Sequence, residues 1–141
     1  MLVKSAVALV TVALACMTGG DHHGGGVEGL GDIKVTELMT KDLPEMAGKE
    51  GMMITVEYPP GGQDPVHRHH AHAFVYVLEG SIVMQVKGGK EVTLHPGETF
   101  YEGPDDLHTV GKNASQTKPA KFVVFLVKNK DAPVLVPEQQ H

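Results

Sequence analysis

Residues 61–80 read GGQDPVHRHHAHAFVYVLEG, with four histidines inside six positions followed by an apolar stretch that ends on glycine. His67 and His69 are one residue apart, and alternate side chains of a β-strand share a face, so both imidazoles can point into one interior. That interior is otherwise apolar, and a metal ion would give two neutral imidazoles a partner there. Taken alone, an H-x-H pair is more typical of a solvated turn.

The sequence on either side predicts an all-β domain. β-forming residues dominate segments 52–58, 74–80, 81–94 and 120–127, and glycine or proline turns separate them. Gly88-Gly89 lies between two such arms and predicts a hairpin. No window shows a sustained helical period. We therefore expect one antiparallel sandwich or barrel over residues 33–136, followed by a tail at 137–141.

Two segments resemble the motifs of the cupin superfamily, of the conserved-barrel type. In the first motif, Gly61, His67, His69 and Gly80 fall at the family's places. In the second, PGETFYEGPDDLHTVGKN (96–113) supplies Gly97, His108 and Asn113. The resemblance covers roughly residues 50–130 and implies a double-stranded β-helix whose histidines bind a divalent metal inside. Many cupins also pair through sheet edges and exchanged terminal strands, which implies a homodimer.

The first motif lacks its usual glutamate, because Ala73 or Phe74 stands at that place, depending on the spacer. We therefore expect His67, His69 and His108 to form a metal centre without a carboxylate. Such an ion would keep its full +2 charge, bind anionic ligands readily and leave positions open for substrate or dioxygen. Some cupin dioxygenases use three histidines in this way. The alternative is a site that has decayed into a structural barrel.

Further candidates come from strand alternation. His72 neighbours the empty glutamate position and could be a fourth ligand, although strand parity places it opposite His67 and His69. Three residues are candidates for a substrate pocket around the metal, namely Tyr76, Gln85 and Phe100. No distinct general base and no catalytic triad is evident in the sequence.

The amino-terminal residues predict export. A lysine precedes the apolar run AVALVTVALA, which is too short to span a bilayer, and Ala13-Leu14-Ala15 suits a signal peptidase. We expect residues 1–15 to be a signal peptide and residues 16–32 a Gly-rich tether. Cys16 resembles the lipidated cysteine of bacterial lipoproteins, so the protein is expected to be periplasmic or anchored to the membrane.

Composition excludes some classes of partner. The chain carries a net charge of −5 and has no basic cluster, which argues against binding nucleic acid. A small-molecule ligand fits better. The leading functional hypothesis is a dioxygenase-like oxidoreductase or a lyase that uses Fe, Mn, Ni, Cu, Co or Zn. The alternatives are a non-catalytic cupin that binds a small molecule or metal, and a structural dimeric barrel.

Overall fold

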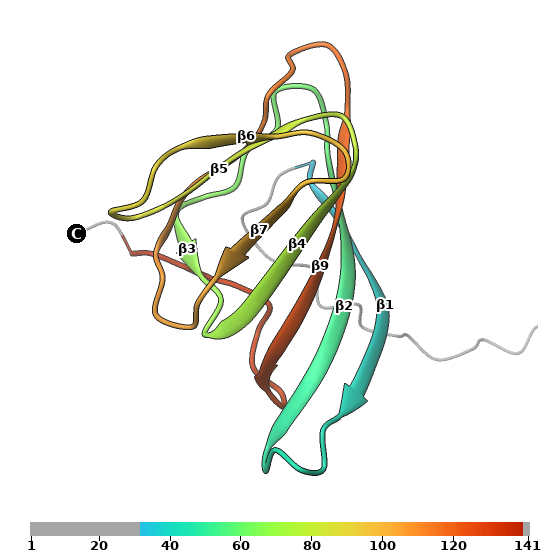
Figure 1. Cartoon of the computed structure of the whole chain (residues 1–141), viewed down its shortest axis with the longest axis vertical. Coiled ribbons are helices and arrows are strands. Elements are labelled where there is room, and N and C mark those ends of the chain that lie inside the picture. The colour runs from blue at the N-terminus through green and yellow to red at the C-terminus, as the bar shows by residue number, and fades with distance from the viewer. Residues whose placement is uncertain (1–31, 140–141) are drawn as a thin grey trace, which may run out of the picture.

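The computed structural model describes residues 32–139, and every regular element in that range is a β-strand (Figure 1). The strands are β1 (Lys34–Asp42), β2 (Lys49–Tyr58), β3 (His67–Arg68), β4 (Ala71–Glu79), β5 (Ile82–Val86), β6 (Val92–Leu94), β7 (Thr99–Glu102), β8 (His108–Asn113), β9 (Ala120–Asn129) and β10 (Val136–Pro137). The expected signal peptide, Cys16 and most of the tether lie outside the described residues. Within them, no helix has the length and hydropathy needed to cross a membrane.

The strands form two five-stranded sheets. Sheet A has the order β1-β2-β9-β4-β7, and sheet B has the order β10-β3-β8-β5-β6. All pairs are antiparallel, and the chain passes repeatedly from one sheet to the other. Figure 1 shows the sheet A strands running side by side. This arrangement confirms the predicted double-stranded β-helix, and the predicted hairpin connects β5 to β6 at Gly88, whose φ of 84° suits glycine.

The core lies between the two sheets. Sheet A contributes Ile54, Val75 and Phe122, and sheet B contributes Ile82 and Met84, all of them buried. Alternation is strict along β4, where every second residue from Ala71 to Val77 is buried and the residues between them are exposed. A strand that alternates in this way has one face in the core and one outside. The inner face carries the candidate site, and the outer face is unusually apolar.

Candidate metal centre

His67 and His69 are held by backbone carbonyl groups. His67 begins β3 and its Nδ1 lies 2.7 Å from the carbonyl oxygen of Pro65, while His69 Nδ1 lies 2.7 Å from that of Val134. A carbonyl oxygen can only accept, so each Nδ1 carries the proton and donates it. Both Nε2 atoms therefore face the interior, where they are 3.1 Å apart. Val134, whose carbonyl accepts the hydrogen bond from His69, belongs to the C-terminal strap, which we define as residues 130–139.

His108 begins β8 and is the direct cross-strand partner of His67. Its Nδ1 lies 3.3 Å from His67 Nε2, and its Nε2 is buried with no hydrogen-bond partner among residues 32–139. Glycine at position 111 leaves room for this ring, since a Cβ there would lie 2.9 Å from His108 Cε1. The same Cβ would lie 2.9 Å from a carboxylate oxygen of Asp64. The structure thus brings the three predicted histidines together.

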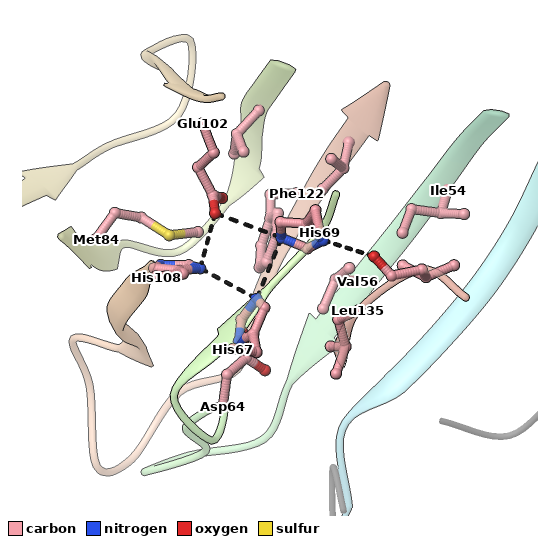
Figure 2. A pocket seen from close by; sticks show the side chains of 13 residues that line it. Ile54, Val56, Asp64, His67, His69, Met84, Glu102, His108, Phe122 and Leu135 are labelled. Carbon is pink, nitrogen blue, oxygen red and sulfur yellow. Dashed lines mark hydrogen bonds and ion pairs between the residues drawn. The ribbon is translucent and has the colours of Figure 1, made fainter. Parts of the chain in front are cut away.

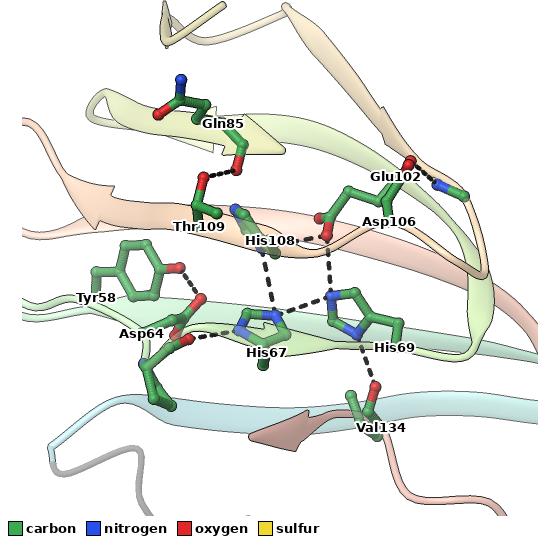
Figure 3. A network of polar contacts seen from close by, with 12 residues as sticks. Tyr58, Asp64, His67, His69, Gln85, Glu102, Asp106, His108, Thr109 and Val134 are labelled. Carbon is green, nitrogen blue, oxygen red and sulfur yellow. Dashed lines mark hydrogen bonds and ion pairs between the residues drawn. The ribbon is translucent and has the colours of Figure 1, made fainter. Parts of the chain in front are cut away.

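A carboxylate joins the histidines, contrary to the expectation of a centre without one. Glu102, the last residue of β7, has only 3% of its surface exposed. Its Oε2 lies 3.2 Å from His108 Nδ1 and 3.4 Å from His69 Nε2 (Figure 3). Within the described part of the chain, this oxygen has no hydrogen-bond partner of good geometry. The three-histidine prediction was incomplete, because the ligand-type group has four members among residues 32–139: His67, His69, Glu102 and His108.

Glu102 occupies the missing place from the neighbouring strand. Its cross-strand partner is Ala73, which faces the interior with no exposed surface, whereas Phe74 points outward. Side chains of directly paired residues lie on the same face, with Cβ atoms roughly 5 Å apart. The small Ala73 leaves the space that the Glu102 side chain enters. The usual glutamate is therefore replaced by one on the adjacent strand.

The four groups shift one another's pKa values. Burial alone would raise the pKa of Glu102, but the neighbouring histidines, His69 first, hold it below its ordinary value. Burial would lower the pKa of His69, yet its contact with Glu102 outweighs burial and raises it. Burial lowers the pKa of His67 to about 4 and also lowers that of His108. Without metal, the carboxylate is thus ionised and His69 is the imidazole that most readily holds a proton.

The donor atoms fit a divalent metal ion. Neighbouring donors around the group are separated by 3.1 to 3.4 Å. Ligands at about 2.1 Å from an ion lie about 3.0 Å apart at right angles and about 3.4 Å apart in a tetrahedron. When both imidazoles are neutral, the buried lone pairs on Nε2 of His67 and Nε2 of His69 face each other and repel. The buried Glu102 oxygen, which lacks a hydrogen bond, adds a further cost in folding free energy. A cation among these four atoms would satisfy all of them.

The group opens on a small apolar cavity (Figure 2). Apart from the four ligand-type residues and Asp64, the lining is hydrophobic: Ile54, Val56, Val75, Met84, Phe122, Val124, Val134 and Leu135. Its free volume is about 30 Å³, enough for an ion and one or two small molecules such as water. Val134 and Leu135 belong to the C-terminal strap, which therefore closes one side of the cavity.

Asp64 and Tyr58 form a second buried polar pair beside the histidines. The Tyr58 hydroxyl donates a hydrogen bond to Asp64 Oδ2, and Tyr58 has no exposed surface (Figure 3). Burial raises the pKa of Asp64 to about 6, although the hydrogen bond from Tyr58 opposes this. Burial and the Asp64 carboxylate both raise the pKa of Tyr58. Asp64 could not be singled out from the sequence, because an Asp-Pro pair is an ordinary turn signal.

His72 and Tyr76 lie outside the centre. Both are on the exposed face of β4, where His72 Nδ1 lies 2.7 Å from the Tyr101 hydroxyl and Tyr76 is 48% exposed. His72 cannot reach the other histidines from that face, as strand parity indicated. The prediction that Tyr76 lines the pocket was wrong for the same reason.

Gln85 also lies away from the cavity, whereas Phe100 is near it. The Gln85 amide donates to the carbonyl of Gly89 across the hairpin turn, and Figure 3 shows it turned away from the histidines. Phe100 packs against the core and stacks on His108 with ring centroids 6.5 Å apart, but it does not line the cavity. Phe100 therefore supports the position of a ligand-type histidine.

Solved structures with the same fold have diverse activities. The polyketide cyclase RemF from Streptomyces resistomycificus is 23% identical, with a TM-score of 0.61, over 80% of this chain and 75% of that one. A recombinant oxalate oxidase in complex with glycolate is 24% identical, with a TM-score of 0.59, over 94% and 72% of the two chains. The DMSP lyase DddQ from Ruegeria pomeroyi is 20% identical, with a TM-score of 0.54, over 64% of this chain and 45% of the lyase. At these identities the likeness shows the fold alone.

The sequence itself identifies the family. No curated protein matches the chain. Residues 54–126, slightly more than half of the chain, match the family described as "Cupin domain". These residues include both histidine motifs and the strands β4 to β8. The chain therefore belongs to the cupin domain family.

Proposed function

We propose that this cupin binds one divalent metal ion through His67, His69, Glu102 and His108, and that it oxidises or lyses a small organic substrate. The observation that carries the proposal is the convergence of four buried donor atoms, 3.1 to 3.4 Å between neighbours, with no lysine or arginine of residues 32–139 paired to them. A mixed set of imidazoles and one carboxylate suits Fe, Mn, Co, Ni, Cu or Zn.

The bound ion would act as a Lewis acid and, if redox-active, as an electron carrier. The ionised Glu102 cancels one of its two charges, so the centre would keep one net positive charge. In an apolar cavity, that charge still favours a substrate with an anionic oxygen, such as a carboxylate. The narrow cavity favours a substrate of few atoms, or one that displaces the strap.

Asp64 is the candidate for proton transfer. Its carboxyl group lines the cavity beside the metal ligands, and its raised pKa of about 6 lies near neutral pH, where a general base is most effective. Tyr58 holds this carboxyl group in place through its hydroxyl. We expect Asp64→Asn to keep the metal and lose most turnover, and Tyr58→Phe to lose less. Loss of the metal in Asp64→Asn would show instead that Asp64 supports the ligands.

The decisive experiment is metal analysis of protein purified without an affinity tag, followed by turnover assays. A panel of small carboxylates would be assayed with and without dioxygen, because oxidation consumes dioxygen and lysis does not. Dioxygen uptake would favour the oxidoreductase, and product formed without dioxygen would favour the lyase. A metal-loaded protein that binds members of the panel without converting any would support the non-catalytic alternative and overturn the enzymatic proposal.

Export is part of the proposal and depends on sequence alone. The charged start, apolar run and Ala13-Leu14-Ala15 support removal of residues 1–15, which would leave Cys16 first. Mass spectrometry of the native protein tests this. A diacylglyceryl mass on Cys16 would establish a lipid anchor, and an intact Met1 would contradict export.

A further inference from the structure

The outer face of sheet A carries an unbroken row of large apolar side chains. The row crosses all five strands in direct register, from β1 to β7: Met39, Met53, Phe125, Phe74 and Tyr101. We call these five residues the apolar row. Each is exposed, by 61%, 36%, 37%, 49% and 48% in that order. Figure 1 shows the five strands side by side, so the row spans the full width of the sheet.

On one side, the residues next to the apolar row are also poor in charge. The next outward row on one side consists of Thr36, Thr55, Val123, Tyr76 and Thr99. The charged side chains beyond it neutralise one another, since Lys34 and Lys121 each lie 3.6 Å from Glu57. In an antiparallel sheet with one face in water, the outward positions of the strands are normally occupied by polar residues. The apolar row contains no charged side chain, so contact with water is costly there.

The size of the patch corresponds to an interface. The apolar row together with Tyr76 exposes roughly 600 Å², at the upper end of the largest apolar patch on a typical monomer. It is also about three quarters of the surface that one partner buries in an interface of standard size, roughly 800 Å². The aromatic members already contact one another, with ring centroids 5.2 Å apart for Phe74 and Tyr101 and 6.3 Å apart for Phe74 and Phe125. They form an ordered, broad surface rather than isolated side chains.

We propose that a second copy of this chain covers the apolar row, face to face, about a two-fold axis that lies between the two sheets, parallel to β9 and over Phe125. The order of residues in the row supports this occupant. Methionines form one end, aromatics form the other, and Phe125 is in the middle. The proposed axis reverses the row, so Met53 of one copy meets Phe74 of the other, and Met39 meets Tyr101.

Each of these contacts is favourable. Thioether groups pack well against aromatic rings, and two sheets pack face to face about 10 Å apart with their strands nearly aligned. An axis along the row itself would place methionine on methionine and would forgo the sulfur–aromatic contacts. The interface differs from the sheet-edge pairing that the family resemblance implied, because it uses the face of sheet A.

The first test is the oligomeric state of the full chain and of two variants. Light scattering and sedimentation of the wild type at micromolar concentration should give twice the mass of one chain. Phe74→Lys and Met53→Glu should each weaken association about a hundredfold, the loss expected of a central interface residue. Met46→Glu is the matched control, because Met46 is 47% exposed in the turn between β1 and β2, away from the row. It should remain dimeric.

A mixture of the variants tests the axis. In a mixed dimer of Phe74→Lys with Met53→Glu, the two new charges would face each other across the interface. The symmetry-related contact, Met53 of the first variant with Phe74 of the second, would keep its native residues. The mixture should therefore associate when neither variant does so alone. Restored association of Phe74→Lys with Phe74→Glu instead would overturn the proposed axis.

Methionine oxidation identifies what covers the face. In the dimer, Met39 should react with peroxide at least tenfold more slowly than Met46, although Met39 is the more exposed of the two within one chain. A monomeric wild type would overturn the proposal, and so would a dimer that Phe74→Lys leaves intact. A monomer in which Met39 is still protected would assign the face to residues 1–31 or to another ligand.

Discussion

Moving the carboxylate back across the β4–β7 ladder provides a direct test of the metal centre. Glu102→Ala removes the proposed carboxylate ligand, and adding Ala73→Glu places a carboxylate on its direct cross-strand partner, on the same interior face. The exchange nearly conserves the buried volume, so the core should accept it at small cost. His72→Glu combined with Glu102→Ala is the matched control, because position 72 is adjacent to Ala73 but faces outward.

The expected size of the effect follows from linkage. An ion at a hundred times its dissociation constant stabilises the folded chain by about 2.7 kcal/mol, which raises the Tm of a domain of about 100 residues by about 12 °C. A hydrogen bond to a charged group contributes up to about 3 kcal/mol, and we use this value as the scale for the bond between the buried Glu102 and the ion. Its loss would weaken binding roughly 150-fold. At the same metal concentration, the remaining stabilisation is about 0.3 kcal/mol, or about 1 °C.

The assay is thermal unfolding of each variant with and without the ion, since the difference cancels changes in the metal-free stability. The wild type and the Ala73→Glu/Glu102→Ala variant should show large shifts, and Glu102→Ala and the His72→Glu control should show almost none. A full shift in Glu102→Ala would refute the assignment of Glu102 as a ligand. A double variant no better than Glu102→Ala would refute the view that the two positions are interchangeable.

Three further predictions concern neighbouring groups. His67→Ala should lose bound metal in elemental analysis while circular dichroism stays unchanged, whereas His72→Ala should retain the metal; full occupancy in His67→Ala would contradict the site. Because the pKa of His69 is raised, metal must displace its proton, so affinity should fall as pH drops through that pKa. Calorimetry in buffers of different ionisation enthalpy should then detect proton release that grows from pH 8 toward 6, and its absence would count against a protonated His69. Glu50→Ala should lower the free energy of unfolding, measured in urea, by about 3 kcal/mol, because the buried Lys128 ammonium loses the carboxylate that lies 2.6 Å from it. A decrease of less than about 1 kcal/mol would show that solvent reaches Lys128.

The sequence predicted the fold and the histidines well, for a physical reason. Glycine turns and alternating strands are local signals, and the inward parity of His67 and the apolar run after it can be read along one segment. His108 was found through its motif rather than through parity. The pairing of His67 with His108 across β3 and β8 then required the structure.

Glu102 was missed because its role depends on a contact between strands. The motif pointed to position 73 on β4, and the sequence does not state that β7 lies beside β4 with Glu102 opposite Ala73. One local signal was present, since Glu102 is two residues beyond the inward-facing Phe100 and so shares its face. Tyr76 and Gln85 were chosen by strand alternation, which separates the two faces of a strand but does not say which of them points inward. Tyr76 lies on the exposed face of β4, and the Gln85 amide bonds to Gly89 in the hairpin turn.

The C-terminal strap connects access to the cavity with the strength of the metal site. It lines the cavity through Val134 and Leu135, and it also supplies the carbonyl group that orients His69. Any opening of the strap that admits a substrate therefore also frees the His69 ring. By thermodynamic reciprocity, an ion that prefers the ordered ring must hold the strap closed to the same extent. Metal loading should slow hydrogen exchange of the Glu138 amide, which bonds to the carbonyl of Val66, and a centre that is opened often will lose its ion more readily.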